Sequence, residues 1–157
     1  MDERNRIVNI SMAEQNEIQR GLKIEHDLAV AIFDLLEDNF FSPKSGELGP
    51  FILTLGANDN RLKITVMDEG SAYLFDFSLS FSNFRSVVKD YFLICDSYYD
   101  AIKFDSPAKL QSIDMARRSL HDEGSEILIK SVSKFIDLDF ETARQFFTII
   151  CIIVDRK

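Results

Sequence analysis

The sequence of 157 residues is poor in the residue types that build special scaffolds. It has no tryptophan, two cysteines, three prolines and six glycines. These counts exclude a collagen-like, fibrous or disulfide-stapled chain, and Cys95 and Cys151, both in apolar helical patterns, are expected to be reduced, buried thiols. With 46% hydrophobic and 28% charged residues, the composition is typical of a folded protein. The length predicts a single globular domain, residues 1–157.

Positive charge is also scarce. The chain has 18 Lys and Arg residues against 26 Asp and Glu residues, which gives a net charge of −8. Proteins that clamp a nucleic-acid backbone need clustered Lys and Arg to displace counterions. Here the basic residues are scattered, with one adjacent pair in the interior, Arg117 and Arg118. We therefore expect no nucleic-acid partner, although the composition leaves room for a local basic patch.

Long apolar runs are absent as well. The longest run, residues 146–154, is interrupted by Thr148 and is far shorter than the roughly 20 residues that span a bilayer. Four of the first six residues are charged, and no apolar segment follows them, unlike a secretory signal. The sequence therefore predicts a cytoplasmic protein that makes no membrane contact.

The short motifs of common catalytic and cofactor sites are missing too. There is no C-x-x-C pair, no G-x-S-x-G turn, no G-x-G-x-x-G loop and no Walker loop. The two histidines, His26 and His121, are not at the spacing of a metal-binding pair. We expect no metal and no cofactor. The sequence does not decide whether the protein is an enzyme, but it favours a non-catalytic role.

Hydrophobic periodicity predicts strands in the first half of the chain, around one helix. Residues 6–10 are a short opening strand, residues 24–40 a helix and residues 41–50 a loop. Residues 51–55, 62–66 and 73–79 follow as three strands joined by turn-forming residues, which predicts an antiparallel meander. The aromatic face of this meander, Tyr73, Phe75 and Phe77, should pack on the helix that comes next.

The second half of the chain is predicted to be helical. Apolar residues recur at spacings of three and four from Phe84 to Ile102, and Ser106 with Pro107 is a typical helix start. Gly124 either ends that next helix or lies within it, and a last helix, residues 140–154, begins after Asp139. The predicted fold is therefore α+β: a short N-terminal strand and helix, a three-stranded antiparallel meander, then three to four C-terminal helices packed on one face.

Four segments together are similar to a known family. They are HDLAVAIFDLL at 26–36, KDYFLICDSYY at 89–99, IDMARRSLHDEGSE at 113–126 and TAR at 142–144. In this order the chain resembles the uncharacterised bacterial protein family zero-two-six-two, from about residue 7 to residue 151. The resemblance implies a cytoplasmic bacterial protein, and it implies no activity, cofactor or catalytic residue.

The most polar helical segment, residues 114–126, is the candidate site. Asp114, Arg118 and Asp122 lie four apart and can form an acid–base–acid ladder, while Arg117 and His121 share the neighbouring face. Two guanidinium groups and an imidazole can grip a carboxylate or a phosphate. The candidate ligand-binding residues are Arg117, Arg118, His121, Glu123 and Glu126. In an enzyme, the acid–base group would be Asp122, Glu123 or Glu126.

The alternative interpretation of this segment is an ordinary solvated helix face with a glycine cap. The two interpretations differ in one structural respect. A binding site requires that the three basic side chains converge with Asp90 or Tyr91 on a concave pocket, whereas a solvated face spreads them into solvent.

The closing helix is apolar on nearly every side. One small meander is not expected to cover all of it, so we predict a symmetric homodimer whose interface contains Phe146, Phe147, Ile150 and Ile153. The alternative is a monomer in which this helix is the central core element. The sequence thus favours a non-catalytic interaction or regulatory protein, and the alternatives are a small anionic-ligand binder or an enzyme that uses Arg117, Arg118 and His121.

Overall fold

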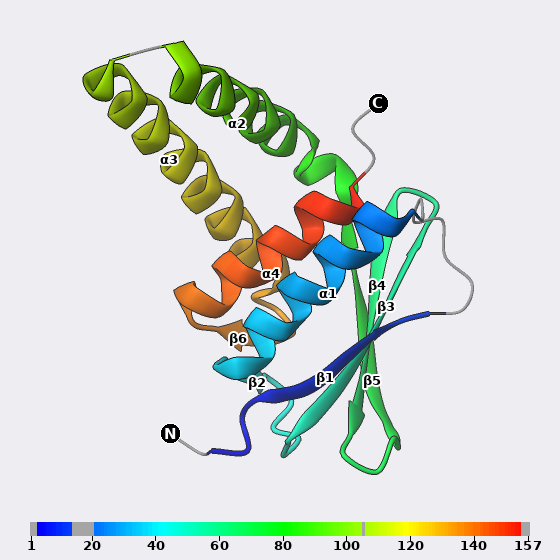
Figure 1. The fold of residues 1–157 in the computed structure, drawn as a ribbon. Coiled ribbons are helices and arrows are strands. Elements are labelled where there is room, and N and C mark those ends of the chain that lie inside the picture. Colours follow the sequence, from blue (N-terminus) through cyan, green and yellow to red (C-terminus); the bar gives the residue numbers. More distant parts are fainter. Residues whose placement is uncertain (1–2, 14–20, 105, 155–157) are drawn as a thin grey trace.

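A four-stranded sheet forms one layer of the molecule. The computed structural model describes residues 3–13, 21–104 and 106–154. The strand order is β1 (Ile7–Met12), β3 (Phe51–Asn58), β4 (Arg61–Asp68) and β5 (Tyr73–Ser80), with β1 parallel to β3 and the other pairs antiparallel. The α+β fold and the meander predicted from the sequence are therefore confirmed (Figure 1).

Local chemistry explains the meander. In β4, Leu62, Ile64 and Val66 are buried, and they alternate with more exposed residues, as a half-buried strand requires. The β3–β4 turn places Asp59 and Asn60 at φ values of 52° and 63°. Positive φ at both central residues is the geometry of a type I′ hairpin, which Asn and Asp tolerate well.

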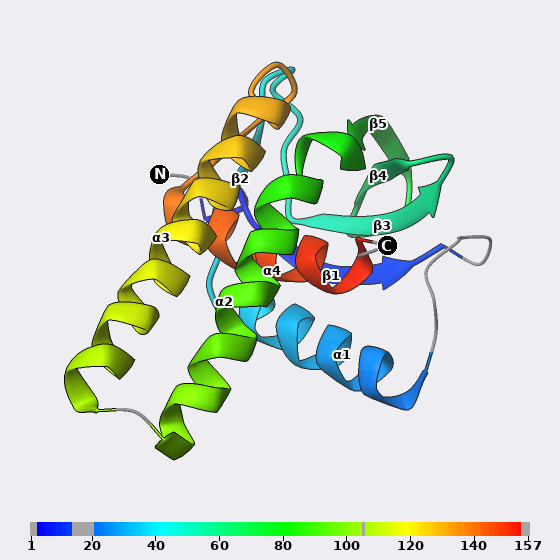
Figure 2. The same ribbon diagram turned by 90° about the horizontal axis from the view of Figure 1, so that it is seen from above.

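Two helices cover one face of the sheet. Helices α1 (Leu22–Glu37) and α4 (Phe140–Ile153) lie side by side there (Figures 1 and 2). The Asp139 carboxylate caps α4 by accepting a hydrogen bond of 2.9 Å from the Thr142 amide, as the sequence predicted for the start of this helix.

The burial of α4 corrects the interface prediction. Phe146, Phe147, Ile150 and Ile153 are 0–7% exposed within one chain, because α4 packs against α1 and α3 and its side chains join the core of the sheet. These four side chains do not stay uncovered, as the alternative of a central core helix expected, although Phe140 at the start of α4 is 40% exposed. The homodimer itself stays a prediction, but these four side chains offer it no exposed surface.

The remaining two long helices form an antiparallel hairpin. After a short 3-10 helix, η1 (Phe81–Asn83), come α2 (Arg85–Phe104) and α3 (Pro107–Val132), which project away from the body of the molecule (Figures 1 and 2). Ser106 caps α3 and Pro107 occupies its first position, as predicted. Helix α3 runs through Gly124 without a break, so this glycine is not a C-cap. It allows a close approach, because a Cβ there would lie 2.2 Å from the Phe147 ring.

Three other predictions need correction. Residues 41–50 are not all loop, because β2 (Phe41–Pro43) pairs antiparallel with β6 (Ile136–Leu138). The aromatic face of the meander does not pack on α2: Tyr73 is 62% exposed, and the Phe77 ring stacks on Phe135, beyond the end of α3, at 5.2 Å. Finally, Cys151 is buried but Cys95 is only partly so. Within the described ranges, no helix combines the length and the apolar character needed to cross a bilayer.

Candidate functional site

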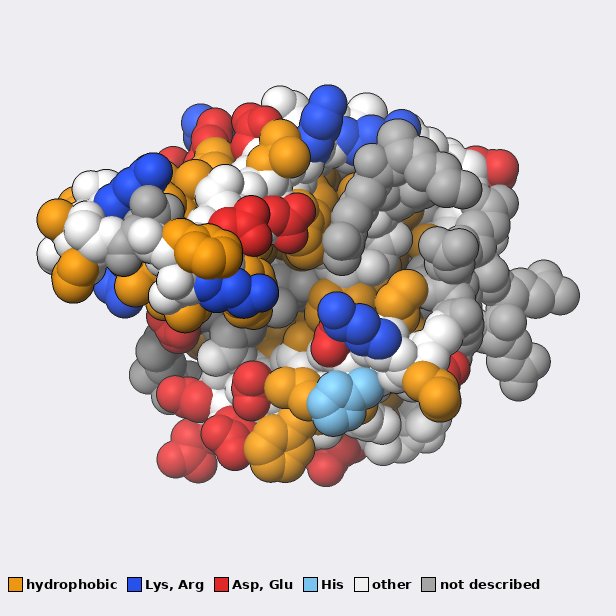
Figure 3. Space-filling model, turned by 45° about the horizontal axis from the view of Figure 1, so that its top comes forward, with side chains coloured by type: hydrophobic (Ala, Val, Ile, Leu, Met, Phe, Trp, Pro, Cys, Tyr) orange, Lys and Arg blue, Asp and Glu red, His pale blue; other side chains and the backbone are white. Residues whose placement is uncertain are grey.

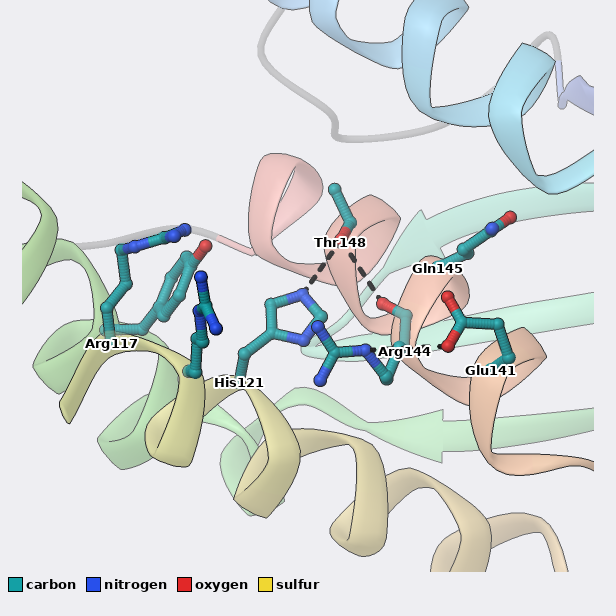
Figure 4. Close-up of a pocket in the computed structure, with 8 residues that line it drawn as sticks. Arg117, His121, Glu141, Arg144, Gln145 and Thr148 are labelled. Atoms are coloured by element: carbon teal, nitrogen blue, oxygen red, sulfur yellow. Dashed lines mark hydrogen bonds and ion pairs between the residues drawn. The ribbon is translucent and has the colours of Figure 1, made fainter. Parts of the chain in front are cut away.

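A polar pocket of about 300 Å³ lies where α2, α3 and α4 meet. Figure 4 shows the side chains that line it. The lining is almost entirely polar and comes from all three helices: Tyr91, Arg117, Arg118, His121, Glu141, Arg144, Gln145 and Thr148.

Helix α3 contributes two arginines that are held by one carboxylate. Arg117 donates to Asp114 Oδ1 through Nε at 3.1 Å and through Nη2 at 2.7 Å, and Arg118 Nη2 lies 3.0 Å from Asp114 Oδ2. The hydrogen bond from Arg117 is the main reason that the pKa of Asp114 is lowered. The same bond raises the pKa of Arg117. Both guanidinium groups are therefore charged and held at the mouth of the pocket.

Helix α4 contributes the opposite wall. Glu141, Arg144, Gln145 and Thr148 are spaced three, one and three residues apart, which places them on one face of the helix. Arg144 forms an ion pair with Asp122 of α3, and its Nε lies 3.9 Å from Glu141 Oε2. Figure 4 shows the Glu141 carboxylate turned toward Arg144. In the predicted acid–base–acid ladder, Asp122 therefore pairs with Arg144 in place of Arg118.

His121 forms the buried floor of the pocket and is 9% exposed. Its Nε2 lies 2.9 Å from the Thr148 hydroxyl, and that hydroxyl donates to the Arg144 carbonyl oxygen at 3.2 Å. Because the hydroxyl has one proton, His121 Nε2–H is the donor to Thr148, which leaves Nδ1 as an acceptor. Nδ1 is buried and has no hydrogen-bond partner among the described residues. Burial first, and then nearby Arg144, lower the pKa of His121 to about 4, so the ring is neutral at pH 7.

Tyr91 of α2 completes the floor. Its ring contacts His121 edge-on, with centroids 5.4 Å apart. Burial is the main cause that raises the pKa of Tyr91 to about 12, so its hydroxyl keeps its proton at neutral pH. The pocket thus combines charged guanidinium groups with neutral hydroxyl, amide and imidazole groups, and Glu141 is its one acidic lining residue.

Comparison with known proteins identifies the family. The model of the "Uncharacterised protein family (UPF0262)" matches residues 4–156. The chain belongs to this family. A "UPF0262 protein" from Paramagnetospirillum magneticum is 42% identical over 98% of both chains. Relatives from Rhodopseudomonas palustris strain TIE-1 and Nitrobacter winogradskyi are each 45% identical over 97% of this chain and over 93% and 91% of their own lengths, respectively. No solved structure matches the chain.

The family assignment confirms the resemblance but gives no site, so the pocket stands on its geometry alone. Arg117, Arg118 and His121 do converge with Tyr91 on a concave surface, as a binding site requires. Glu123 and Glu126, by contrast, are exposed and do not line the pocket. Among the described residues, no three His, Cys, Asp or Glu side chains are grouped as metal ligands.

Sequence reasoning missed the wall from α4. Its signal was present: within the apolar run of the last helix, the polar residues recur on one face, at Glu141, Arg144, Gln145 and Thr148. That pattern is typical of a helix whose single polar face meets a pocket or solvent.

Proposed function

We propose that this protein binds a small anionic molecule in the pocket between α2, α3 and α4. The observation that carries the proposal is the concentration of three arginines from two helices around one hollow, in a chain whose net charge is −8. Arg117 and Arg118 approach from α3 and Arg144 from α4, whereas Glu141 is the single acidic side chain in the lining. A pocket of about 300 Å³ is at the small end of ligand sites.

The existing ion pairs hold the arginines in place without using all their donors. Each guanidinium has five N–H groups in a fixed fork, and Asp114 and Asp122 occupy only some of them. Neither aspartate lines the pocket. The remaining N–H groups can therefore donate to an anion without loss of the ion pairs that position the side chains.

The state of His121 supports binding over catalysis. An efficient general base has a pKa close to the working pH, and the pKa of His121 is lowered to about 4. The Thr148 hydroxyl, its hydrogen-bond partner, donates a hydrogen bond to the Arg144 carbonyl oxygen. Neither group is therefore placed as a general base, and the enzyme alternative has less support than the binder.

Calorimetric titration of the full chain with inorganic phosphate and with succinate tests the proposal. At least one of these anions should bind, and the Arg117→Ala/Arg118→Ala variant should bind it about tenfold or more weakly. The variant should fold normally, because both side chains lie at the edge of the molecule and Asp114 keeps access to water. Lys63→Ala removes an exposed charge on β4, outside the pocket, and should leave binding unchanged. Absence of binding by both anions would contradict the proposal.

Self-association is a second candidate, and the end of the hairpin supports it. Tyr99, Ile102 and Phe104 are 67%, 54% and 85% exposed, near the far end of α2. Figure 3 shows hydrophobic side chains among charged ones on this projecting part of the molecule. Two copies that pair hairpin to hairpin would bury these side chains in both chains at once. Light scattering should then give about twice 18.0 kDa, and Phe104→Asp should lower the mass toward that of one chain.

The remaining predictions about location and partners fit this proposal. Small anionic metabolites are abundant in the cytoplasm, the compartment that we predict for this protein. The three pocket arginines line a concave site in place of the broad basic face that a nucleic-acid backbone needs, which supports the prediction of no nucleic-acid partner.

A further inference from the structure

We infer that the ligand is a phosphomonoester of a small hydroxylated molecule, with its phosphate group on the three arginines and a hydroxyl group near Glu141. This inference rests on the proposed function and narrows its ligand class. It follows from three properties of the pocket: the directions from which the arginines approach, the volume, and the position of the single carboxylate.

The arrangement of the arginines suits a tetrahedral dianion. A planar carboxylate has two oxygens, which one guanidinium fork can occupy in full. Here Arg117 approaches from α3 and Arg144 from α4 (Figure 4), and Arg118 of α3 also lines the pocket. A phosphate group offers three oxygens in different directions, so it can accept from all three side chains at once. Tyr91, whose pKa is raised to about 12, adds a neutral hydroxyl on the same floor.

The volume leaves room for more than phosphate. A water molecule occupies about 30 Å³ in the liquid, so a pocket of about 300 Å³ is larger than the five non-hydrogen atoms of a phosphate group require. The rest of the ligand should be polar, because Gln145, Thr148 and Glu141 form the wall beside the arginines, and the only rings in the lining are those of Tyr91 and His121.

Glu141 determines which chemical groups the pocket favours on the rest of the ligand. Its carboxylate is 3.9 Å from the Nε atom of Arg144 and belongs to the lining. A negative charge at this place repels a second anionic group, which disfavours dicarboxylates and bisphosphates. The same carboxylate is a strong acceptor for a hydroxyl group on the ligand. The pocket therefore favours one phosphate group joined to a hydroxylated body.

Calorimetric titrations at pH 8, where a phosphomonoester is a dianion, compare three probes on the full chain. These are inorganic phosphate, glycerol 3-phosphate and succinate. Glycerol 3-phosphate should bind tightest, with an affinity about tenfold or more higher than that of succinate. If succinate binds as tightly as glycerol 3-phosphate, the ligand class is wrong but the anion pocket stands. If none of the three binds, the proposed function fails.

The Glu141→Gln variant tests the hydroxyl contact, because it should change the affinities for the two phosphates in opposite directions. Loss of the negative charge should strengthen the binding of inorganic phosphate and weaken the binding of glycerol 3-phosphate. Glu123→Gln is the matched control, since it removes the same charge from an exposed position outside the pocket and should change neither affinity. If Glu141→Gln strengthens both phosphates alike, the carboxylate only repels and the inferred hydroxyl contact is overturned.

Discussion

At the scale of single residues, His121 links the pocket to pH. The ring is neutral in the folded protein because its pKa is lowered from 6.5 to about 4. An unfolded chain takes up a proton near pH 6.5, whereas the folded chain does so only near pH 4. The unfolded state therefore binds more protons in this window, and stability falls as the pH falls through it. The contribution of the neutral His121 ring to the free energy of unfolding is complete above pH 6.5 and is lost progressively down to pH 4.

We expect the free energy of unfolding to fall by about 2 kcal/mol between pH 7 and pH 5 because of this one residue. Urea unfolding at both pH values measures it. His121→Gln keeps a neutral donor for Thr148 and should remove most of the difference, whatever its own stability. His26→Gln, at the exposed histidine of α1, should keep it. An unchanged pH dependence in His121→Gln would show that other groups cause it.

Gly124 decides how closely α3 approaches α4. Alanine there favours the helix intrinsically by about 1 kcal/mol, but its Cβ would lie 2.2 Å from Cζ of Phe147, whose side chain is fully buried. We expect a net loss of about 1–3 kcal/mol in the free energy of unfolding of Gly124→Ala, because overpacking outweighs propensity. Denaturant unfolding measures this loss.

The control for this prediction shortens the side chain that the new methyl group would meet. The double variant Gly124→Ala/Phe147→Leu should lose about 1 kcal/mol less free energy of unfolding than the two single variants lose in sum, since leucine frees the space. Ser119→Ala, at an exposed position on the same helix, should change stability little. Additive losses in the double variant would mean that the clash is relieved elsewhere.

At the scale of elements, the two capped helix starts differ in what they support. Asp139 starts α4, which lies in the core, and accepts from Thr142 at 2.9 Å. Ser106 starts α3 at the projecting end of the hairpin and accepts from Lys109 at 3.3 Å. Asp139→Ala should lower the free energy of global unfolding by about 1 kcal/mol. Ser106→Ala should cost less, because that end can open without the core, and urea unfolding of the two variants compares them.

Local pattern was enough to predict some elements and not others. The helices and the meander have strong periodicity, and α3 and α4 also have clear N-caps, so the sequence identified them. The β2–β6 pair joins two three-residue strands far apart in the chain, and no local pattern marks such a pairing. A second long-range contact of this kind holds the start of β1. The side-chain oxygen of Asn39 accepts from the Ile7 backbone N–H at 2.7 Å, and its side-chain nitrogen donates to the Ile7 carbonyl oxygen at 3.0 Å.

The candidate site shows the same division. Arg117, Arg118 and His121 lie within one turn or so of a single helix, so the sequence alone grouped them. Arg144 and Glu141 reach the pocket only because α4 crosses α3 at Gly124, a contact that no spacing reveals. Glu123 and Glu126 were predicted as partners from proximity along the chain, but the orientation of α3 turns them to solvent.

At the scale of the whole molecule, burial is unevenly distributed along the hairpin. The buried residues of α3 begin at His121 and continue to Val132, and none lies in residues 107–120. In α2 they are Val87 and Val88 near the body, with Ala101 alone near the far end. The pocket lies at the boundary between these two parts, since the two helices line it with Tyr91, Arg117, Arg118 and His121. Segments with few buried contacts open more easily than the core.

Hydrogen exchange on the full chain should therefore separate the hairpin into two parts. Amides of residues 98–104 and 106–116 should exchange about a hundredfold faster than those of residues 121–132, because their opening does not disturb the core around α4. A bound phosphomonoester should slow exchange near Arg117 and Tyr91 and leave the far end unchanged. Repeating the measurement from low to high protein concentration adds a control for self-association, which should protect residues 99–104 as concentration rises. Uniform protection along both helices at low concentration would contradict this division, since it would mean that the hairpin opens only with the whole molecule.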